Sequence, residues 1–319
     1  MRCKALLLAI GLVCLSACNR NTKKRIAVIP KGTAQVFWQT IHAGAVAAGR
    51  EFDLEILWDG PPSETDYARQ LEIFDSMLNR HVDGIVVSAA DKSILSGSLD
   101  RAAKAGIPVV VFDSGVESTN YVSFVATNNY QAGQLGARKL AELIGGKGPI
   151  AMLSHAPGSG STMDRERGFK DAVRQEFPGI QIVAEQFSMA DRAKGLASAE
   201  NILASQPGLA GIFASSEPSA VGVARAVKTR GLAGKLKFVG FDSTDGLLED
   251  VTGGVIDALV VQDPFKIGYE GVRVVRDRLA GATPPKQIDL TAAVVSKADL
   301  DKPEIKALLH PDLEKYLGK

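Results

Sequence analysis

Residues 26–44 read IAVIPKGTAQVFWQTIHAG, and this stretch carries the pattern that decides the fold. Its first four residues are apolar and predict a buried strand. A Pro-Lys-Gly-Thr loop follows, and from Phe37 onward apolar residues recur at the spacing of one helix face. A strand joined by a short loop to a helix is the unit from which parallel α/β sheets are built.

Two adjacent aromatic residues, Phe37 and Trp38, lie between this strand and its helix. Consecutive helical residues point about 100° apart, so the two rings do not easily share one buried stripe. The carboxyl ends of strands in an open parallel sheet are also where ligands bind. We therefore expect at least one ring to face a cleft, the alternative being that both belong to the core.

The same alternation of strand and helix continues along most of the chain. Strands joined by helices indicate right-handed βαβ units and a parallel sheet. About ten strands are more than one doubly wound sheet comfortably holds, so we expect two α/β lobes. The predicted strands after the first are 54–58, 84–88, 109–112, 121–125, 150–153, 180–185, 209–213, 237–241, 258–261 and 291–295. The predicted helices are 64–79, 93–105, 131–144, 164–177, 193–204, 218–229, 246–251 and 268–279.

The amino-terminal segment has the features of a secretion signal. Arg2 and Lys4 precede a short apolar run that cannot span a bilayer. The sequence LSAC, ending at Cys18, is similar to a bacterial lipobox and predicts cleavage before Cys18 and lipid attachment to it. The alternative is an ordinary signal peptide cleaved nearby. We expect residues 1–17 to be the signal and residues 18–24 a lipidated tether.

Composition narrows the possible functions. Cys3 and Cys14 would leave with the signal, and Cys18 alone can form neither a disulfide nor a thiolate metal site within the chain. The formal charge is +1, of which the signal carries +2, so the mature chain is near neutral. Near-neutrality argues against nucleic-acid binding. Apolar residues make up 45% of the chain, enough for a full core.

Catalytic signatures are missing from the sequence. The four histidines show no paired metal-ligand spacing, and there is no G-x-S-x-G motif. A glycine-rich turn, HAPGSGSTMDRERGF at residues 155–169, could cradle a phosphate. The more economical interpretation is a flexible turn in which Ser161 or Thr162 caps the following helix. We expect neither an enzyme, nor a cofactor, nor a metal site.

Polar residues recur where predicted strands end. Asp113 ends VVVFD, Asp242 ends FVGFD, Ser216 ends GIFASS and Gln262 ends ALVVQ, while Arg165 opens the helix after the glycine-rich turn. Each alone could be a helix cap or a surface charge. Together with the aromatic pair they predict a cleft for a hydroxyl-rich molecule. Carboxylates and amides bind the hydroxyls of a sugar, and aromatic rings cover its C–H faces.

The chain resembles the ribose-type periplasmic sugar-binding proteins of ABC importers, whose fold also forms the core of lactose-repressor-type regulators. The resemblance covers nearly all of residues 25–295. It rests on FWQTIHAGA, AGIPVVVFDS, DRERGF, DRAKGL, KFVGFDST and VVQDPFKIG. It implies the type I periplasmic binding protein fold, with two doubly wound parallel-sheet lobes joined by a three-segment hinge.

The resemblance also implies where the lobes and ligand contacts lie. The expected ligand-binding residues are Gln35, Phe37, Trp38, Asp113, Ser114, Ser161, Arg165, Ser216, Asp242 and Gln262. The chain is expected to cross between lobes near 126–127, 262–263 and 289–291. The first lobe would then hold residues 25–126 and 263–290, and the second lobe residues 127–262 and 291–319.

Three positions depart from the ribose pattern. Ser114 stands where an arginine is usual, Ala190 replaces an aromatic residue, and Ser216 replaces an asparagine. Smaller side chains at these positions predict a wider cleft. Ribose is then not expected to be the best ligand, unless Phe187, Met189 or Glu217 refills the space.

The function implied is that of an extracytoplasmic, lipid-anchored binding protein. It would capture a small sugar and deliver it to the membrane subunits of an ABC permease, as a monomer. A sensory protein that signals to a membrane receptor is the alternative. A transcription regulator would need a helix-turn-helix where the secretion signal stands, and an enzyme would need the missing catalytic motifs.

Overall fold

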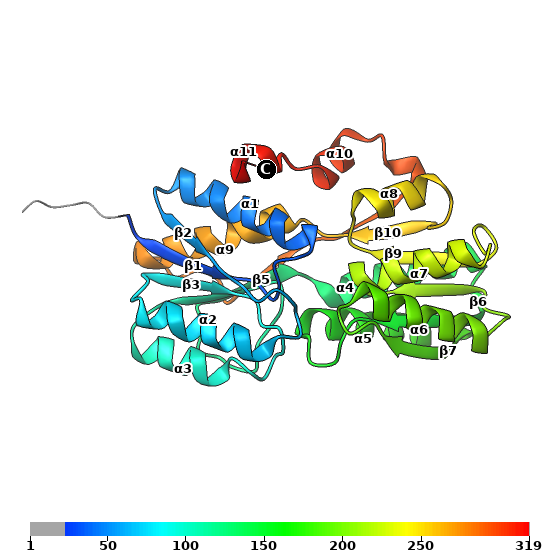
Figure 1. Ribbon diagram of the computed structural model, residues 1–319, viewed down its shortest axis with the longest axis horizontal. Coiled ribbons are helices and arrows are strands. Elements are labelled where there is room, and N and C mark those ends of the chain that lie inside the picture. Colours follow the sequence, from blue (N-terminus) through cyan, green and yellow to red (C-terminus); the bar gives the residue numbers. More distant parts are fainter. Residues whose placement is uncertain (1–22, 319) are drawn as a thin grey trace, which may run out of the picture.

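Two α/β lobes lie side by side in the molecule (Figure 1). The computed structural model describes residues 23–318. Each lobe is built on a six-stranded sheet, so the predicted two-lobe α/β architecture is confirmed. The predicted signal peptide and Cys18 lie outside the described residues.

The first lobe has a fully parallel sheet with helices on both faces. Its four inner strands are short apolar runs buried from both sides, which explains their continuous apolar pattern, whereas the two edge strands are partly exposed. In pairing order they are β11 (Gln287–Leu290), β5 (Ser123–Thr127), β4 (Val109–Phe112), β3 (Gly84–Val87), β1 (Arg25–Ile29) and β2 (Glu55–Trp58). One face packs against α1 (Val36–Glu51) and α9 (Pro264–Leu279), the other against α2 (Tyr67–Asn79) and α3 (Ser96–Lys104).

The second lobe repeats this plan with one antiparallel edge strand. In pairing order its strands are β12 (Ala293–Ser296), β10 (Ala258–Val261), β9 (Lys237–Phe241), β8 (Gly211–Ala214), β6 (Lys147–Ser154) and β7 (Gly179–Phe187), with β12 antiparallel to β10. One face packs against α4 (Asn129–Ile144) and α5 (Gly160–Glu176). The other packs against α6 (Arg192–Ser205), α7 (Glu217–Thr229) and α8 (Asp245–Thr252).

Glycines let one pair of helices approach closely in each lobe. A Cβ atom on Gly44 of α1 would lie 1.9 Å from the carbonyl oxygen of Phe265 in α9. In the second lobe, a Cβ atom on Gly133 of α4 would lie 1.9 Å from the carbonyl oxygen of Arg165 in α5. Only glycine permits such backbone contact. The second pair fixes the position of the helix that carries Arg165.

Three connections join the lobes, as predicted. The chain crosses from β5 to α4, from β10 to α9 and from β11 to β12. The predicted late strand at residues 291–295 corresponds to β12. The strand β11 was not expected, because its sequence QIDL is short and half exposed at the sheet edge.

The carboxyl-terminal segment corrects one predicted boundary. After a 3₁₀ turn (Lys297–Asp299), α10 (Pro303–Leu309) packs on the second lobe through Ile305 and Leu308. The last helix, α11 (Leu313–Leu317), instead packs on α1 of the first lobe. There the guanidinium of Arg50 donates to the carbonyls of Lys315 at 2.8 Å and Tyr316 at 3.0 Å. Assigning all of residues 291–319 to the second lobe is therefore wrong for α11. The other lobe boundaries remain predictions.

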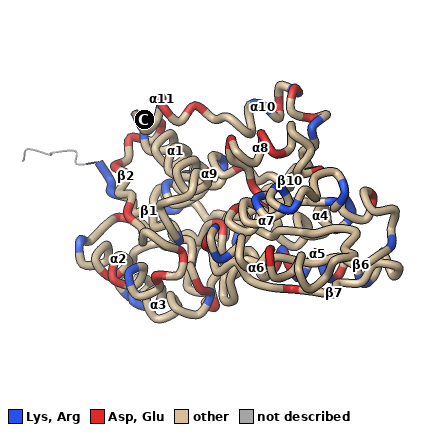
Figure 2. The backbone as a smooth tube through the Cα atoms, turned by 45° about the vertical axis from the view of Figure 1, so that its right-hand side comes forward, with Lys and Arg blue, Asp and Glu red and all other residues tan. Residues whose placement is uncertain are grey.

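Charged residues of both signs are interspersed over both lobes in the view of Figure 2. Between residues 23 and 318, no helix combines the length and apolar character needed to cross a membrane.

Candidate ligand-binding site

A small cavity of about 40 Å³ lies between the lobes, at the carboxyl ends of both sheets. The first lobe contributes Lys31, Gln35, Phe37, Trp38, Glu64 and Asp113 to its lining. The second lobe contributes His155, Ser161, Thr162, Arg165, Ser216, Glu217, Pro218, Asp242 and Gln262. The structure thus brings together all of the expected site residues except Ser114.

The two aspartates occupy corresponding places in the two lobes. Asp113 follows β4 and Asp242 follows β9, and both have positive φ, 55° and 65°. Aspartate is one of the few residues besides glycine that tolerates this left-handed conformation. Such strained backbone is typical of functional sites. Here it directs a carboxylate into the cavity from each sheet.

Lys31 joins the lobes at the centre of the site. Its side chain is buried, and its ammonium donates to the hydroxyls of Ser159 at 3.2 Å and Ser161 at 3.3 Å in the second lobe. It also lies 3.5 Å from Asp113 and 3.7 Å from Glu64 in the first lobe. One buried cation therefore serves two carboxylates and bridges the interface between the lobes.

Glu64 forms a second contact between the lobes. Its carboxylate accepts from the Trp38 indole at 2.9 Å and contacts His155 Nε2 at 3.1 Å. Burial by itself would raise the pKa of Glu64, but Lys31 and His155 outweigh it and lower the pKa from 4.5 to about 2. Glu64 is therefore ionised near neutral pH, and His155 Nε2 must carry the proton that it shares with this carboxylate.

Arg165 is held in the cavity wall by the second lobe. Asn129 Oδ1 accepts from its Nη2 at 2.7 Å and its Nε at 3.2 Å, and the Ser215 carbonyl accepts from Nη1. The guanidinium carbon lies 3.4 Å from the centre of the Phe241 ring. Burial lowers the pKa of Arg165, while Asp242 and then Asp113 oppose this effect. The group is well positioned to donate its remaining N–H bonds to a ligand.

The start of α5 differs from the expectation. The helix begins at Gly160, so Arg165 lies in its second turn and does not open it. Ser159 is the residue at the N-cap, and its side chain makes no cap hydrogen bond. Neither Ser161 nor Thr162 caps the helix, because both lie inside it. The hydroxyls of Ser159 and Ser161 accept from Lys31 instead.

Asp242, Gln262 and Glu217 form the second-lobe end of the cavity. Gln262 Nε2 donates to one Asp242 oxygen at 2.8 Å, and the Glu217 backbone N–H donates to the other at 3.3 Å. Burial raises the pKa of Asp242, against the lowering effects of Arg165 and Gln262. Burial also raises the pKa of Glu217, whose carboxylate accepts from Arg192.

Both predicted aromatic residues border the cavity, which confirms that at least one ring faces the cleft. The ring of Trp38 is buried against the edge of Phe37, with centroids 5.0 Å apart and planes at 87°. Trp38 also meets Phe112 edge-on in the core. Phe37 remains half-buried. The pair therefore joins the core of the first lobe to the cavity.

Two of the three positions behind the expected wider cleft do not border the cavity, so the wider cleft stays a prediction. Ser114 is fully buried outside the lining, and its hydroxyl accepts from the Ser161 backbone N–H at 3.1 Å. Ala190 lies in the turn before α6 and does not border the cavity. Ser216 does border it. Of the side chains considered as space-fillers, Glu217 lines the cavity, whereas Phe187 and Met189 are exposed.

Sequence reasoning missed three charged or titratable members of the site, Lys31, Glu64 and His155. Lys31 and His155 follow β1 and β6 closely, so the strand-end rule that found Asp113 could also have found them. Glu64 lies in an irregular segment before α2, and only the tertiary fold brings it beside Trp38.

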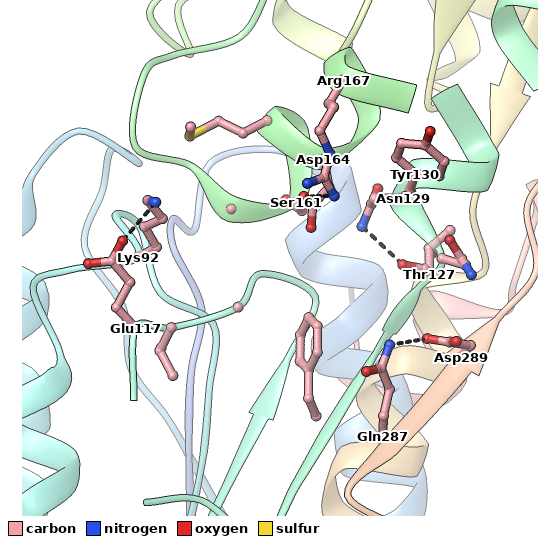
Figure 3. A pocket seen from close by; sticks show the side chains of 16 residues that line it. Lys92, Glu117, Thr127, Asn129, Tyr130, Ser161, Asp164, Arg167, Gln287 and Asp289 are labelled. Atoms are coloured by element: carbon pink, nitrogen blue, oxygen red, sulfur yellow. Dashed lines mark hydrogen bonds and ion pairs between the residues drawn. The ribbon is translucent and has the colours of Figure 1, made fainter. Parts of the chain in front are cut away.

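A larger cavity of about 600 Å³ lies beside the connections between the lobes (Figure 3). The Lys92–Glu117 ion pair stands at the first lobe, and Asp164 and Arg167 of α5 stand opposite. Asn129, whose oxygen holds Arg165, also borders this cavity. Ser161 borders both cavities.

The chain is similar to known periplasmic binding proteins. A family profile described as periplasmic binding protein domain matches residues 26–283. The D-ribose/D-allose-binding protein of Pseudomonas aeruginosa is 30% identical over 285 residues, 86% of this chain and 89% of that protein. The ribose import binding protein of Bacillus subtilis is 28% identical over 240 residues, 75% of this chain and 76% of that protein.

Solved structures show the same relationship. A solute-binding protein from Agrobacterium vitis with bound D-fucose is 36% identical, with a TM-score of 0.86 over 90% of this chain and 100% of that one. A carbohydrate transporter solute-binding protein from Agrobacterium radiobacter in complex with D-arabinose is 32% identical, with a TM-score of 0.88 over 90% of this chain and 99% of that one. The chain therefore belongs to the family of ribose-type periplasmic sugar-binding proteins.

Proposed function

We propose that this protein captures a small sugar between its two lobes outside the cytoplasm and delivers it to an ABC permease. The observation that carries the proposal is the convergence of carboxylates, a guanidinium, an amide and two aromatic rings from both lobes on one cavity. Relatives support it: they are named as a ribose import binding protein, a D-ribose/D-allose-binding protein and a carbohydrate transporter solute-binding protein.

The lobes would open to admit the ligand and then close on it by rotating about the three connections. The cavity of about 40 Å³ is smaller than a sugar requires, so a bound sugar has to hold the lobes further apart than they are here or displace side chains. Lys31 is the side chain most directly in the way, because its ammonium spans both lobes. Contacts that the ligand makes only with both lobes together supply the free energy for closure.

Anchoring and assembly complete the proposal. Lipid attachment at Cys18 would hold the protein at the outer side of a membrane, with residues 18–24 as the tether. The protein would act there as a monomer, beside the permease subunits that receive the sugar.

A thermal-shift panel of pentoses and hexoses tests the binding function. A ligand present at 100 times its Kd should stabilise the folded protein by about 2.7 kcal/mol. We expect at least one sugar to do so, and amino acids of similar size to have no effect. A panel in which no saccharide changes the melting temperature would contradict the proposed function.

A further inference from the structure

Hydrogen bonding is unevenly distributed along the cavity. At the end formed by the first lobe, the ammonium of Lys31 lies 3.5 Å from Asp113, so a cation is already built in. At the other end, Glu217 and Gln262 flank Asp242, and each keeps one buried oxygen without a partner. These atoms are Glu217 Oε2 and Gln262 Oε1.

Both unpartnered oxygens are acceptors on side chains that are only 3% exposed. The orientation of Gln262 follows from chemistry, because its amide nitrogen has to face the Asp242 carboxylate, and this turns its oxygen away. Of the described side chains that line this cavity, only these two have such an atom. A ligand that brings hydrogen-bond donors to this end would satisfy both oxygens.

Carboxylates also outnumber cations in the lining. Four carboxyl groups, those of Glu64, Asp113, Glu217 and Asp242, face two cations, Lys31 and Arg165. Arg192 adds a third cation at Glu217, but its side chain is 54% exposed and partly screened by water. His155 needs only one ring proton to satisfy Glu64, and its other nitrogen can accept from Ser216 at 2.9 Å. The lining therefore carries an excess of negative charge.

The titration of the second-lobe end is consistent with this excess. Burial raises the pKa of both Asp242 and Glu217 against the lowering effects of Arg165 and Arg192, and the carboxylates nearby add a smaller increase. Their ionised forms are thus less favourable than in water. A cationic group beside them would stabilise both carboxylates.

We propose that the bound sugar carries a protonated amino group, which lies between Glu217, Gln262 and Asp242. An ammonium has three donors and no acceptor, so it suits the two unpartnered acceptor oxygens of Glu217 and Gln262 beside the Asp242 carboxylate. A hydroxyl donates once and leaves the charge excess unbalanced. The inference rests on the proposed function and narrows its ligand to amino sugars.

Matched sugar series test this inference by calorimetry at pH 7. Each series contains the amino sugar, its neutral parent and its N-acetyl derivative, with amines at C2, C3 or C6 of glucose, galactose and mannose. We expect at least one amino sugar to bind about tenfold more tightly than both of its neutral counterparts, as a charge-assisted bond would give. If in every series the neutral parent binds as tightly as its amino sugar, the inference is overturned and the proposed function is left intact. A panel in which nothing binds would overturn both.

Two opposite substitutions separate an electrostatic role from a structural one. Glu217→Gln keeps the shape of the side chain and removes its charge, so the preference for amine over hydroxyl should fall about tenfold. Arg192→Gln removes the cation behind Glu217, so the same preference should rise. Glu249→Gln, at an exposed acid in the same lobe, is the matched control and should change neither. Equal changes of the preference in the same direction for both site variants would contradict the proposal.

Discussion

The imidazole of His155, in the second lobe, lies 3.1 Å from the carboxylate of Glu64, in the first. The same carboxylate accepts from the Trp38 indole at 2.9 Å. A single acidic group therefore connects the contact between the lobes to the orientation of an aromatic wall. Because both partners are donors, this arrangement depends on Glu64 being ionised.

The stability of the protein should therefore depend on pH through the ionisation of Glu64. The pKa of Glu64 is about 2 in the folded protein and near 4.5 when unfolded. The stabilisation from this depressed pKa is complete above pH 4.5 and disappears as the pH falls towards 2, amounting to about 3 kcal/mol. The difference in unfolding free energy between wild type and Glu64→Gln, from urea titrations, should shrink over that range. A constant difference between pH 5 and pH 2 would show that Glu64 is not responsible.

Removing Lys31 should destabilise the protein strongly. Lys31→Met leaves Asp113 and Glu64 buried without their shared cation, and breaking a buried ion pair in this way typically costs about 3–5 kcal/mol. The double variant with Glu64→Gln should recover part of the loss, because one uncompensated charge is then gone. Chemical denaturation of the four proteins in this cycle measures the coupling. Strictly additive losses would contradict a direct interaction between Lys31 and Glu64.

Binding should depend on the Asp242 carboxylate. Asp242→Asn preserves the shape of the side chain, but it removes a charged acceptor that contributes about 1.5–3 kcal/mol. We expect affinity for the sugar identified by the thermal-shift panel to fall roughly 10- to 150-fold in calorimetry. Asp245→Asn, at an exposed aspartate of the same lobe, is the control and should bind like wild type. Unchanged affinity in Asp242→Asn would place the ligand elsewhere.

The aromatic wall should make a smaller contribution. Phe37→Leu keeps an apolar side chain but removes the ring face, with an expected loss of about 1 kcal/mol, or roughly fivefold in Kd. Phe187→Leu is a matched control, because Phe187 is 37% exposed and does not border the cavity. Equal losses of affinity in the two variants would argue against stacking on Phe37.

Anchoring can be tested by cell fractionation. Cys18→Ser should release the protein into the soluble extracytoplasmic fraction, because this cysteine is the predicted site of lipid attachment. Wild-type protein should stay with the membranes under the same conditions. Full release of wild type would contradict lipidation.

The sequence predicted the fold well because most of its strands are buried on both faces. Runs such as VVVF at β4 show this burial directly, and they end at the sheet edge where Asp113 and Asp242 stand. Elements without a buried face were harder to predict. The strand β11 alternates exposed and half-buried residues, and its place in the sheet depends on pairing with β5.

The site residues also fall into those that the local pattern could predict and those that depend on the tertiary fold. Those at strand ends could be predicted because connectivity alone places them. Glu64 could not, because its role depends on three partners far away in sequence, Lys31, Trp38 and His155. Arg165 was predicted as a site residue but misplaced along its helix, because the residues before it looked like a turn and proved to be the first turn of α5.

The carboxyl-terminal segment has a mechanical consequence for any motion of the lobes. The three connections start or end at strands that are neighbours in the sheets, β5 and β11 in the first lobe and β10 and β12 in the second. Together they therefore form a hinge at one edge of each sheet. The segment from α10 to α11 forms a further link between the lobes, because α10 packs on the second lobe and α11 on the first. Any separation of the lobes would therefore have to extend residues 310–312 or break the hydrogen bonds of Arg50 to α11.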